Sequence, residues 1–170
     1  MLVSKKPTGT LVLHDLLPGS TLFLLCTGTG LAPFMSIIQD PLTYERFEKI
    51  VLVHGVRYAR ELAYADFITH ELPAHEYLGE QIRTKLHYYP TVTREPFHHR
   101  GRVTTLLESG RLLSDLGLPP LDPLRDRVMI CGSPSMLKDT RGILDSLGFR
   151  VSPHTGIPAD YVIERAFVEK

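Results

Sequence analysis

Short runs of consecutive apolar residues alternate along this chain with stretches whose apolar residues recur at helical spacing. The runs at residues 21–26 (TLFLLC), 50–54 (IVLVH) and 128–131 (VMIC) are almost wholly apolar. This pattern predicts strands that are buried on both faces of a parallel sheet. Residues 85–93 predict a further strand. Shorter candidates for strands lie at residues 10–13, 149–151 and 161–168.

Helical spacing follows most of these runs. It predicts helices over residues 31–39, 61–72, 104–113 and 135–147. Strands that alternate with helices are typical of α/β domains, so we expect a doubly wound parallel five-stranded sheet in the order 3-2-1-4-5, flanked by helices. In this order the first and fourth strands are neighbours, so Cys26 and Cys131 at their ends should lie close together.

The first residues do not fit this pattern, because residues 1–13 belong to no strand–helix–strand unit. They look like the tail of a preceding domain. We therefore expect a division into residues 1–18, the end of another domain and a linker, and residues 19–170, the α/β domain.

Composition narrows the classes of partner and cofactor. The 170 residues include 19 Lys and Arg and 19 Asp and Glu, so no net field favours nucleic acid or an anionic membrane, and we expect neither as a partner. Two cysteines are too few for a disulfide framework, a zinc site or an iron–sulfur cluster, and no histidine pair has the spacing of metal ligands. Reduced thiols and the lack of a signal-peptide pattern predict a cytoplasmic protein without a metal.

Two strand-to-loop junctions carry the candidate chemistry. The first is Thr27-Gly28-Thr29-Gly30, and the second is Cys131-Gly132-Ser133. Glycines after a buried strand let a ligand approach the backbone, and the start of the next helix offers unpaired N–H groups to phosphate. Structural glycines in any strand-to-helix turn would look similar, so both interpretations stay open on these residues alone.

Three arginines suggest which nucleotide would bind. The second strand ends before Arg57, with no acidic residue for the ribose hydroxyls of NAD, and Arg94 and Arg102 follow the third strand. Guanidinium groups suit a phosphate monoester better than a ribose diol, which favours NADP. A lone arginine is usually a solvated surface residue, and that alternative stays open for each of the three.

Taken together, these motifs resemble a known family. The order TGTG-LAPF, HGVR-x3-ELAYADF, TVTRE-x-FHH-x-GR, VMICGSPSM and ERAFVEK is similar to bacterial ferredoxin (or flavodoxin)–NADP reductases over essentially the whole chain. The resemblance implies a two-domain flavoprotein in which a β-barrel holds FAD and an α/β domain holds NADP(H). This chain matches the NADP-binding domain, with residues 1–18 as the end of the barrel and a tail on the flavin side.

The resemblance also implies roles for particular residues. Those at the nucleotide diphosphate are Thr27, Gly28, Thr29 and Gly30, and those at the adenosine 2′-phosphate are Arg57, Thr93, Arg94 and Arg102. Cys131, Gly132 and Ser133 would border the nicotinamide. Those on the flavin side are Glu164, Ala166 and Phe167, with Gly9 and Thr10 passing the FAD diphosphate. Cys131, Glu164 and Ala166 are the candidates nearest the reacting rings.

The implied activity is hydride transfer between nicotinamide and FAD, which would exchange single electrons with ferredoxin or flavodoxin. The family's Arg-x-Tyr-Ser/Thr flavin motif is not in this sequence. We therefore expect this chain alone to retain FAD poorly and to be inactive. The alternative is a non-catalytic nucleotide-binding or docking module that has lost the flavin domain or borrows it from a partner. An apolar face left by a missing barrel would favour self-association.

Overall fold

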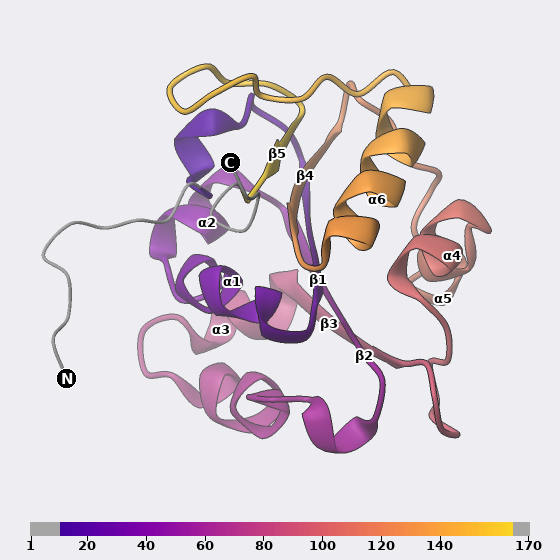
Figure 1. The fold of residues 1–170 in the computed structure, drawn as a ribbon. Coiled ribbons are helices and arrows are strands. Elements are labelled where there is room, and N and C mark those ends of the chain that lie inside the picture. Colours follow the sequence, from indigo (N-terminus) through magenta and orange to yellow (C-terminus); the bar gives the residue numbers. More distant parts are fainter. Residues whose placement is uncertain (1–10, 165–170) are drawn as a thin grey trace, which may run out of the picture.

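The computed structural model describes residues 11–164, and their centre is a parallel sheet between two layers of helices (Figure 1). The sheet has five strands in the order β3-β2-β1-β4-β5, all parallel, which confirms the predicted topology. The strands are β1 (Thr21–Thr27), β2 (Lys49–Val56), β3 (Leu86–Val92), β4 (Asp126–Cys131) and β5 (Tyr161–Ile163).

Helices cover both faces of the sheet. One face carries α1 (Leu31–Ile37), α2 (Pro41–Arg46) and α3 (Gly79–Lys85), and the other carries α4 (Val103–Glu108), α5 (Arg111–Asp115) and α6 (Pro134–Ser146) (Figure 1). Shorter helical turns are η1 (Leu13–Asp15), η2 (Gly28–Gly30), η3 (Ala59–Glu61), the π-helical η4 (Phe67–Glu71) and η5 (Leu72–Ala74).

The core consists of two apolar layers that the central strands separate. In β1, Leu22 and Leu24 face the layer with Phe34 of α1, whereas Phe23 and Leu25 face the layer of α4 to α6. Because both faces of β1 are covered, its first six residues are all buried. This two-sided burial is the physical reason for the continuous apolar runs in the sequence.

Several local predictions were wrong. Residues 11–13 form no strand, because Leu13 begins the 3-10 turn η1. The predicted helix at 61–72 begins only at residue 65, after η3 and a turn with Tyr64 at φ 62°, and most of it is the π-helical η4. The predicted helix at 104–113 is two helices, because Gly110 (φ 75°) separates α4 from α5. Residues 149–151 contribute a single bridge, from Val151 to Tyr161.

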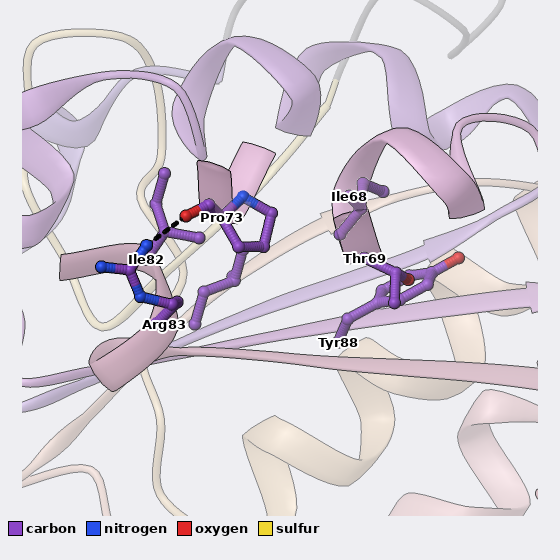
Figure 2. A pocket seen from close by; sticks show the side chains of 7 residues that line it. Ile68, Thr69, Pro73, Ile82, Arg83 and Tyr88 are labelled. Atoms are coloured by element: carbon purple, nitrogen blue, oxygen red, sulfur yellow. Dashed lines mark hydrogen bonds between the residues drawn. The ribbon is translucent and has the colours of Figure 1, made fainter. Parts of the chain in front are cut away.

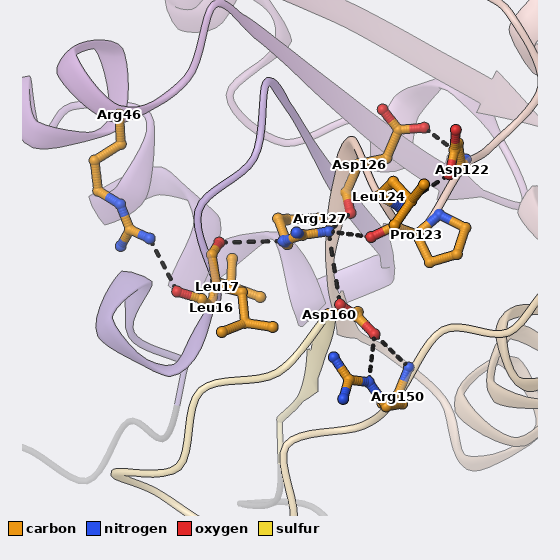
Figure 3. A network of polar contacts seen from close by, with 10 residues as sticks. All are labelled: Leu16, Leu17, Arg46, Asp122, Pro123, Leu124, Asp126, Arg127, Arg150 and Asp160. Carbon is orange, nitrogen blue, oxygen red and sulfur yellow. Dashed lines mark hydrogen bonds and ion pairs between the residues drawn. The ribbon is translucent and has the colours of Figure 1, made fainter.

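Two arginines, the buried Arg127 and the half-buried Arg46, fasten residues 13–17 to the rest of the domain (Figure 3). Arg127 of β4 is 5% exposed; its guanidinium donates to the carbonyls of Leu17, Pro123 and Asp126 and lies 3.7 Å from Asp160. Arg46 donates to the carbonyls of Leu13 and Leu16. The segment just before β1 is thus packed against the α/β domain. The division at residue 18 stays a prediction.

Candidate functional site

The carboxyl ends of the parallel strands meet at one edge of the sheet. Cys26, the last but one residue of β1, is in register with His54 of β2 on one side and Cys131 of β4 on the other. The two cysteines are therefore neighbours, as predicted, and both are buried free thiols. Ligands of open α/β sheets bind outside such an edge, so the loops that follow these strands form the candidate site.

The turn after β1 combines an exposed stretch of backbone with a tight contact. Gly28 is exposed and has φ 54°, with open space where a Cβ would stand. Gly30 is buried, and a Cβ there would lie 2.7 Å from the carbonyl carbon of Cys131. The exposed backbone of Gly28 and Thr29 is what this turn offers to a ligand.

The turn after β4 is joined to the turn after β1 by a hydrogen bond. The backbone N–H of Ser133 donates to the hydroxyl of Thr27 at 3.2 Å. The side chain of Ser133 also caps α6, because its hydroxyl accepts the N–H of Met136 at 3.3 Å. A Cβ at Gly132 would collide with the Thr27 side chain. The two junctions of the sequence therefore form one continuous surface.

The backbones of the three arginines gather at the ends of β2 and β3. The N–H of Arg94 donates to the carbonyl of Arg57 at 2.9 Å, and the N–H of Thr93 donates to Val56 at 3.1 Å. Arg102 follows Gly101, whose N–H donates to Val92 at 3.1 Å. All three arginines are exposed. Within residues 11–164, no hydrogen bond or ion pair is recorded for their guanidinium groups, which leaves their donors available to a ligand. Convergence of the guanidinium groups on one phosphate stays a prediction.

Two glutamates that sequence reasoning missed hold the loop that carries Arg57. The carboxylate of Glu61 accepts the N–H groups of Arg57 (2.9 Å) and Tyr58 (3.0 Å), and these bonds lower the pKa of Glu61. Glu95 accepts the N–H of Ala59. Glu61 stands three residues after Tyr58, which is the place of a capping glutamate. Tyr58 is not the Ser or Thr that marks a capping box in a sequence, so this role could not be recognised from the sequence pattern. Glu95 gives no local signal either.

The loop between β3 and α4 is ordered by His99. Its ring stacks on Tyr89 with ring centroids 3.8 Å apart, and its backbone carbonyl accepts the N–H of Val92 at 3.0 Å. The hydroxyl of Tyr89 donates in turn to Asp115 of α5 at 2.7 Å. This packing holds the chain close to β3 between Arg94 and Arg102.

The candidates nearest the reacting rings lie partly within the structure. Cys131 is completely buried, and burial, with a smaller effect from the Glu164 carboxylate, raises the pKa of its thiol to about 11. The thiol is therefore protonated at neutral pH and is no nucleophile. Glu164 is 2% exposed, and its N–H donates to Ile130 at 2.9 Å. Four other candidates lie outside the described residues, namely Gly9, Thr10, Ala166 and Phe167.

One buried polar residue at this edge was passed over in the sequence as an ordinary end of a strand. His54 of β2 is 0% exposed, and its Nε2 lies 3.0 Å from the carbonyl oxygen of Gly28. Burial lowers the pKa of His54, so the ring is neutral. A lone histidine within the otherwise apolar run IVLVH was the signal in the sequence.

A cavity of about 440 Å³ lies elsewhere, between η4, α3 and the first half of β3 (Figure 2). Its lining includes Ile68, Tyr88 and Arg83, whose guanidinium donates to the carbonyl of Pro73. None of the candidate nucleotide-binding residues lines it. Among residues 11–164 no cluster of three His, Cys, Asp or Glu is arranged to hold a metal, and no helix is both long and apolar enough to span a bilayer.

Sequence comparison relates this chain to an oxidoreductase domain family and to ferredoxin–NADP reductases. The family model described as the oxidoreductase NAD-binding domain matches residues 24–142. The ferredoxin–NADP reductase of Pseudomonas aeruginosa is 65% identical over 170 residues, which are 100% of this chain and 66% of the relative. That of Azotobacter vinelandii is 64% identical with the same coverage. The chain thus spans just under two thirds of the length of these curated relatives.

A solved structure has a three-dimensional fold similar to that of this chain. It is a ferredoxin NADP+ reductase from Neisseria gonorrhoeae with bound FAD and NADP, and it superposes with a TM-score of 0.77 at 32% sequence identity. The similarity covers 92% of this chain and 60% of the other. The parallel sheet in the order 3-2-1-4-5 is therefore the fold of the matching part of that protein.

Proposed function

We propose, since this chain belongs to the oxidoreductase NAD-binding domain family, that it is the NADP(H)-binding domain of a ferredoxin/flavodoxin–NADP reductase. The observation that carries the proposal is the carboxyl edge of the sheet. There an exposed glycine turn follows β1, and three exposed arginines follow the next two strands, β2 and β3. Their guanidinium groups have no hydrogen-bond or ion-pair partner among residues 11–164. The names of the relatives favour this reading over a non-catalytic docking module.

The edge fits the two charged groups of NADP(H). The exposed backbone at Gly28 and Thr29 suits the diphosphate, because a ligand can approach it closely there. Arg57, Arg94 and Arg102 suit the adenosine 2′-phosphate, since guanidinium groups bind phosphate through paired N–H donors. Thr93, which the resemblance implies at the same phosphate, donates its hydroxyl to the carbonyl of Val56 at 3.4 Å, so the arginines would supply the donors. The capping of the Arg57 loop by Glu61 supports this arrangement, because it fixes the backbone from which Arg57 extends.

The nicotinamide would lie against Cys131, Gly132 and Ser133. The Cys131 thiol is protonated and would add no charge beside the ring. Gly132 lets the Thr27 side chain pack against the end of β4, which keeps the two turns together under the ring. FAD, when bound, would supply the redox chemistry by exchanging a hydride with the nicotinamide and single electrons with ferredoxin or flavodoxin. We propose that Glu164, Ala166 and Phe167 approach the flavin, and that residues 1–18, with Gly9 and Thr10, connect to the domain that holds it.

We extend the proposal to the partner protein, the cellular location and the self-association of this chain. Ferredoxin or flavodoxin as its partner follows from the names of the relatives. A cytoplasmic location accords with the two free thiols. Self-association of this chain alone, through a face that the flavin domain would cover, is testable by measuring its size at several concentrations.

Calorimetric titration with NADPH and NADH tests the proposal. We expect NADPH to bind far more tightly than NADH. Charge-assisted hydrogen bonds contribute about 1.5 kcal/mol or more each, so the double variant Arg94→Ala/Arg102→Ala should lose about 3 kcal/mol, roughly 150-fold in affinity for NADPH. Its affinity for NADH should change little.

Arg141→Ala is the matched control for this titration. Arg141 is an exposed arginine of α6 whose guanidinium pairs with Asp145 at 3.5 Å rather than with the candidate edge. This variant should retain the NADPH preference. Equal affinities for NADPH and NADH in the unmodified chain would refute the proposal.

A further inference from the structure

His54 is a polar side chain at a buried position of the sheet where few hydrogen-bond partners are in reach. It is 0% exposed and lies in β2 between Cys26 of β1 and Pro90 of β3. The preceding residues of the strand from Ile50 to Val53 are apolar and completely buried. Burying an imidazole without full hydrogen bonding is costly, whereas an aliphatic side chain would suit such a strand.

One hydrogen bond accounts for the ring's polar contacts. Its Nε2 lies 3.0 Å from the carbonyl oxygen of Gly28. Because a carbonyl oxygen only accepts, Nε2 must carry the proton. The other nitrogen, Nδ1, is buried and has no hydrogen-bond partner among residues 11–164. Among residues 11–164, the hydrogen bond of the His54 ring thus links it to the glycine turn after β1.

Because the peptide bond between Gly28 and Thr29 is planar, the contact of the Gly28 carbonyl with His54 also fixes the direction of the Thr29 N–H. No cis peptide is present between residues 11 and 164, so the bond from Gly28 to Thr29 is trans. In a trans peptide the C=O of one residue and the N–H of the next point in opposite directions. A Gly28 carbonyl that is held toward His54 therefore turns the Thr29 N–H away from it. Both Gly28 and Thr29 are exposed.

We propose that His54 is a positioning residue for the nucleotide, because its Nε2–H fixes the Gly28–Thr29 peptide with the Thr29 amide directed at the diphosphate. This inference rests on the proposed function, since it requires a nucleotide diphosphate at the turn. His54 itself does not touch the nucleotide. Its role differs from that of the arginines, because the diphosphate is common to NADPH and NADH whereas the 2′-phosphate is not.

Two variants separate the hydrogen bond from the packing. His54→Leu keeps an apolar side chain in the strand and removes the donor. His54→Gln restores an N–H donor, because the glutamine amide nitrogen is as many bonds from the backbone as Nε2. Three ligands separate the phosphates: NADPH, NADH, and 2′-AMP, which has the 2′-phosphate but no diphosphate. Circular dichroism of each variant confirms that it is folded.

We expect His54→Leu to weaken NADPH and NADH by the same factor, about tenfold for a lost hydrogen bond, while its affinity for 2′-AMP stays that of the parent. His54→Gln should bind NADPH nearly as well as the parent. In the unmodified chain, long-range ¹⁵N NMR of the His54 ring should show the proton on Nε2, and His54→Leu should shift the Thr29 amide signal.

Other results would overturn either this inference alone or the proposed function as well. Unchanged NADPH affinity in His54→Leu, an equal loss for 2′-AMP, no recovery in His54→Gln, or a proton on Nδ1 would overturn the inference and leave the proposed function standing. Failure of the unmodified chain to bind NADPH would overturn the proposed function, and this inference with it.

Discussion

Replacing Gly30 by alanine tests the close approach of the first turn to β4. The added Cβ would lie 2.7 Å from the carbonyl carbon of Cys131 and 3.1 Å from the nitrogen of Gly132. These are backbone atoms, which cannot rotate away as a side chain does. Overpacking of this kind costs about 1–3 kcal/mol, and we expect the upper end because the end of β4 is also fixed by its pairing with β1.

The loss of glycine in the unfolded chain offsets part of this cost, by about 0.4–1 kcal/mol. The free energy of unfolding of Gly30→Ala should therefore fall by about 2 kcal/mol, which lowers the Tm of a domain of this size by roughly 4–8 °C. The sequence contains no tryptophan, so far-ultraviolet circular dichroism in urea is the suitable assay.

Gly142→Ala is the matched control for this substitution. Gly142 lies in α6, is exposed and has nothing within 4 Å of an added Cβ. Alanine there should raise the free energy of unfolding by about 0.5–1 kcal/mol, because it is the better helix former. A Gly30→Ala variant that unfolds at the urea concentration of the parent, or above it, would refute the proposed contact between the two turns.

Three further predictions follow from buried polar groups. Arg127→Met should lower the free energy of unfolding by about 3 kcal/mol, because it removes one partner of a buried ion pair; unchanged urea unfolding would contradict this. His54 should contribute a loss of stability of up to about 1.4 kcal/mol per pH unit below about pH 6.5, because its pKa is lowered by burial and only the unfolded chain binds the proton readily. His54→Gln should therefore show a smaller slope of stability against pH, and an equal slope would argue against this. Cys26 and Cys131, buried and with raised pKa values, should react with a thiol reagent at pH 7 only on unfolding, and rapid labelling of the native chain would count against the structure.

The strands were predictable from sequence because the sheet is covered on both faces. Each central strand is therefore a continuous apolar run, which periodicity detects without knowledge of its partners. The helices were less predictable. In α3 only Gly79 and Ile82 are buried, too few to give a periodic signal. The break between α4 and α5 depends on the left-handed conformation of Gly110, which an apolar count does not register.

The candidate site, like the fold, was predictable from the sequence only in part. The glycine turns and the arginines follow strands directly, so the topology alone brings their backbones to one edge. Their fixation depends on contacts between distant parts of the chain, such as the bond from Ser133 to Thr27, 106 residues apart. Glu95 supports the loop at Ala59, 36 residues earlier. No local pattern encodes such pairs, which explains why these contacts, and the role of Glu95, were missed.

Amide NMR of the ¹⁵N-labelled chain during titration with NADP+ tests most directly whether the carboxyl edge of the sheet binds the nucleotide. The largest shifts should appear at residues 27–30, at Arg57, Arg94 and Arg102, and at residues 131–133. Residues around the cavity at Tyr88 should change little. Shifts confined to that cavity, or no saturable shifts at the carboxyl edge, would contradict the account.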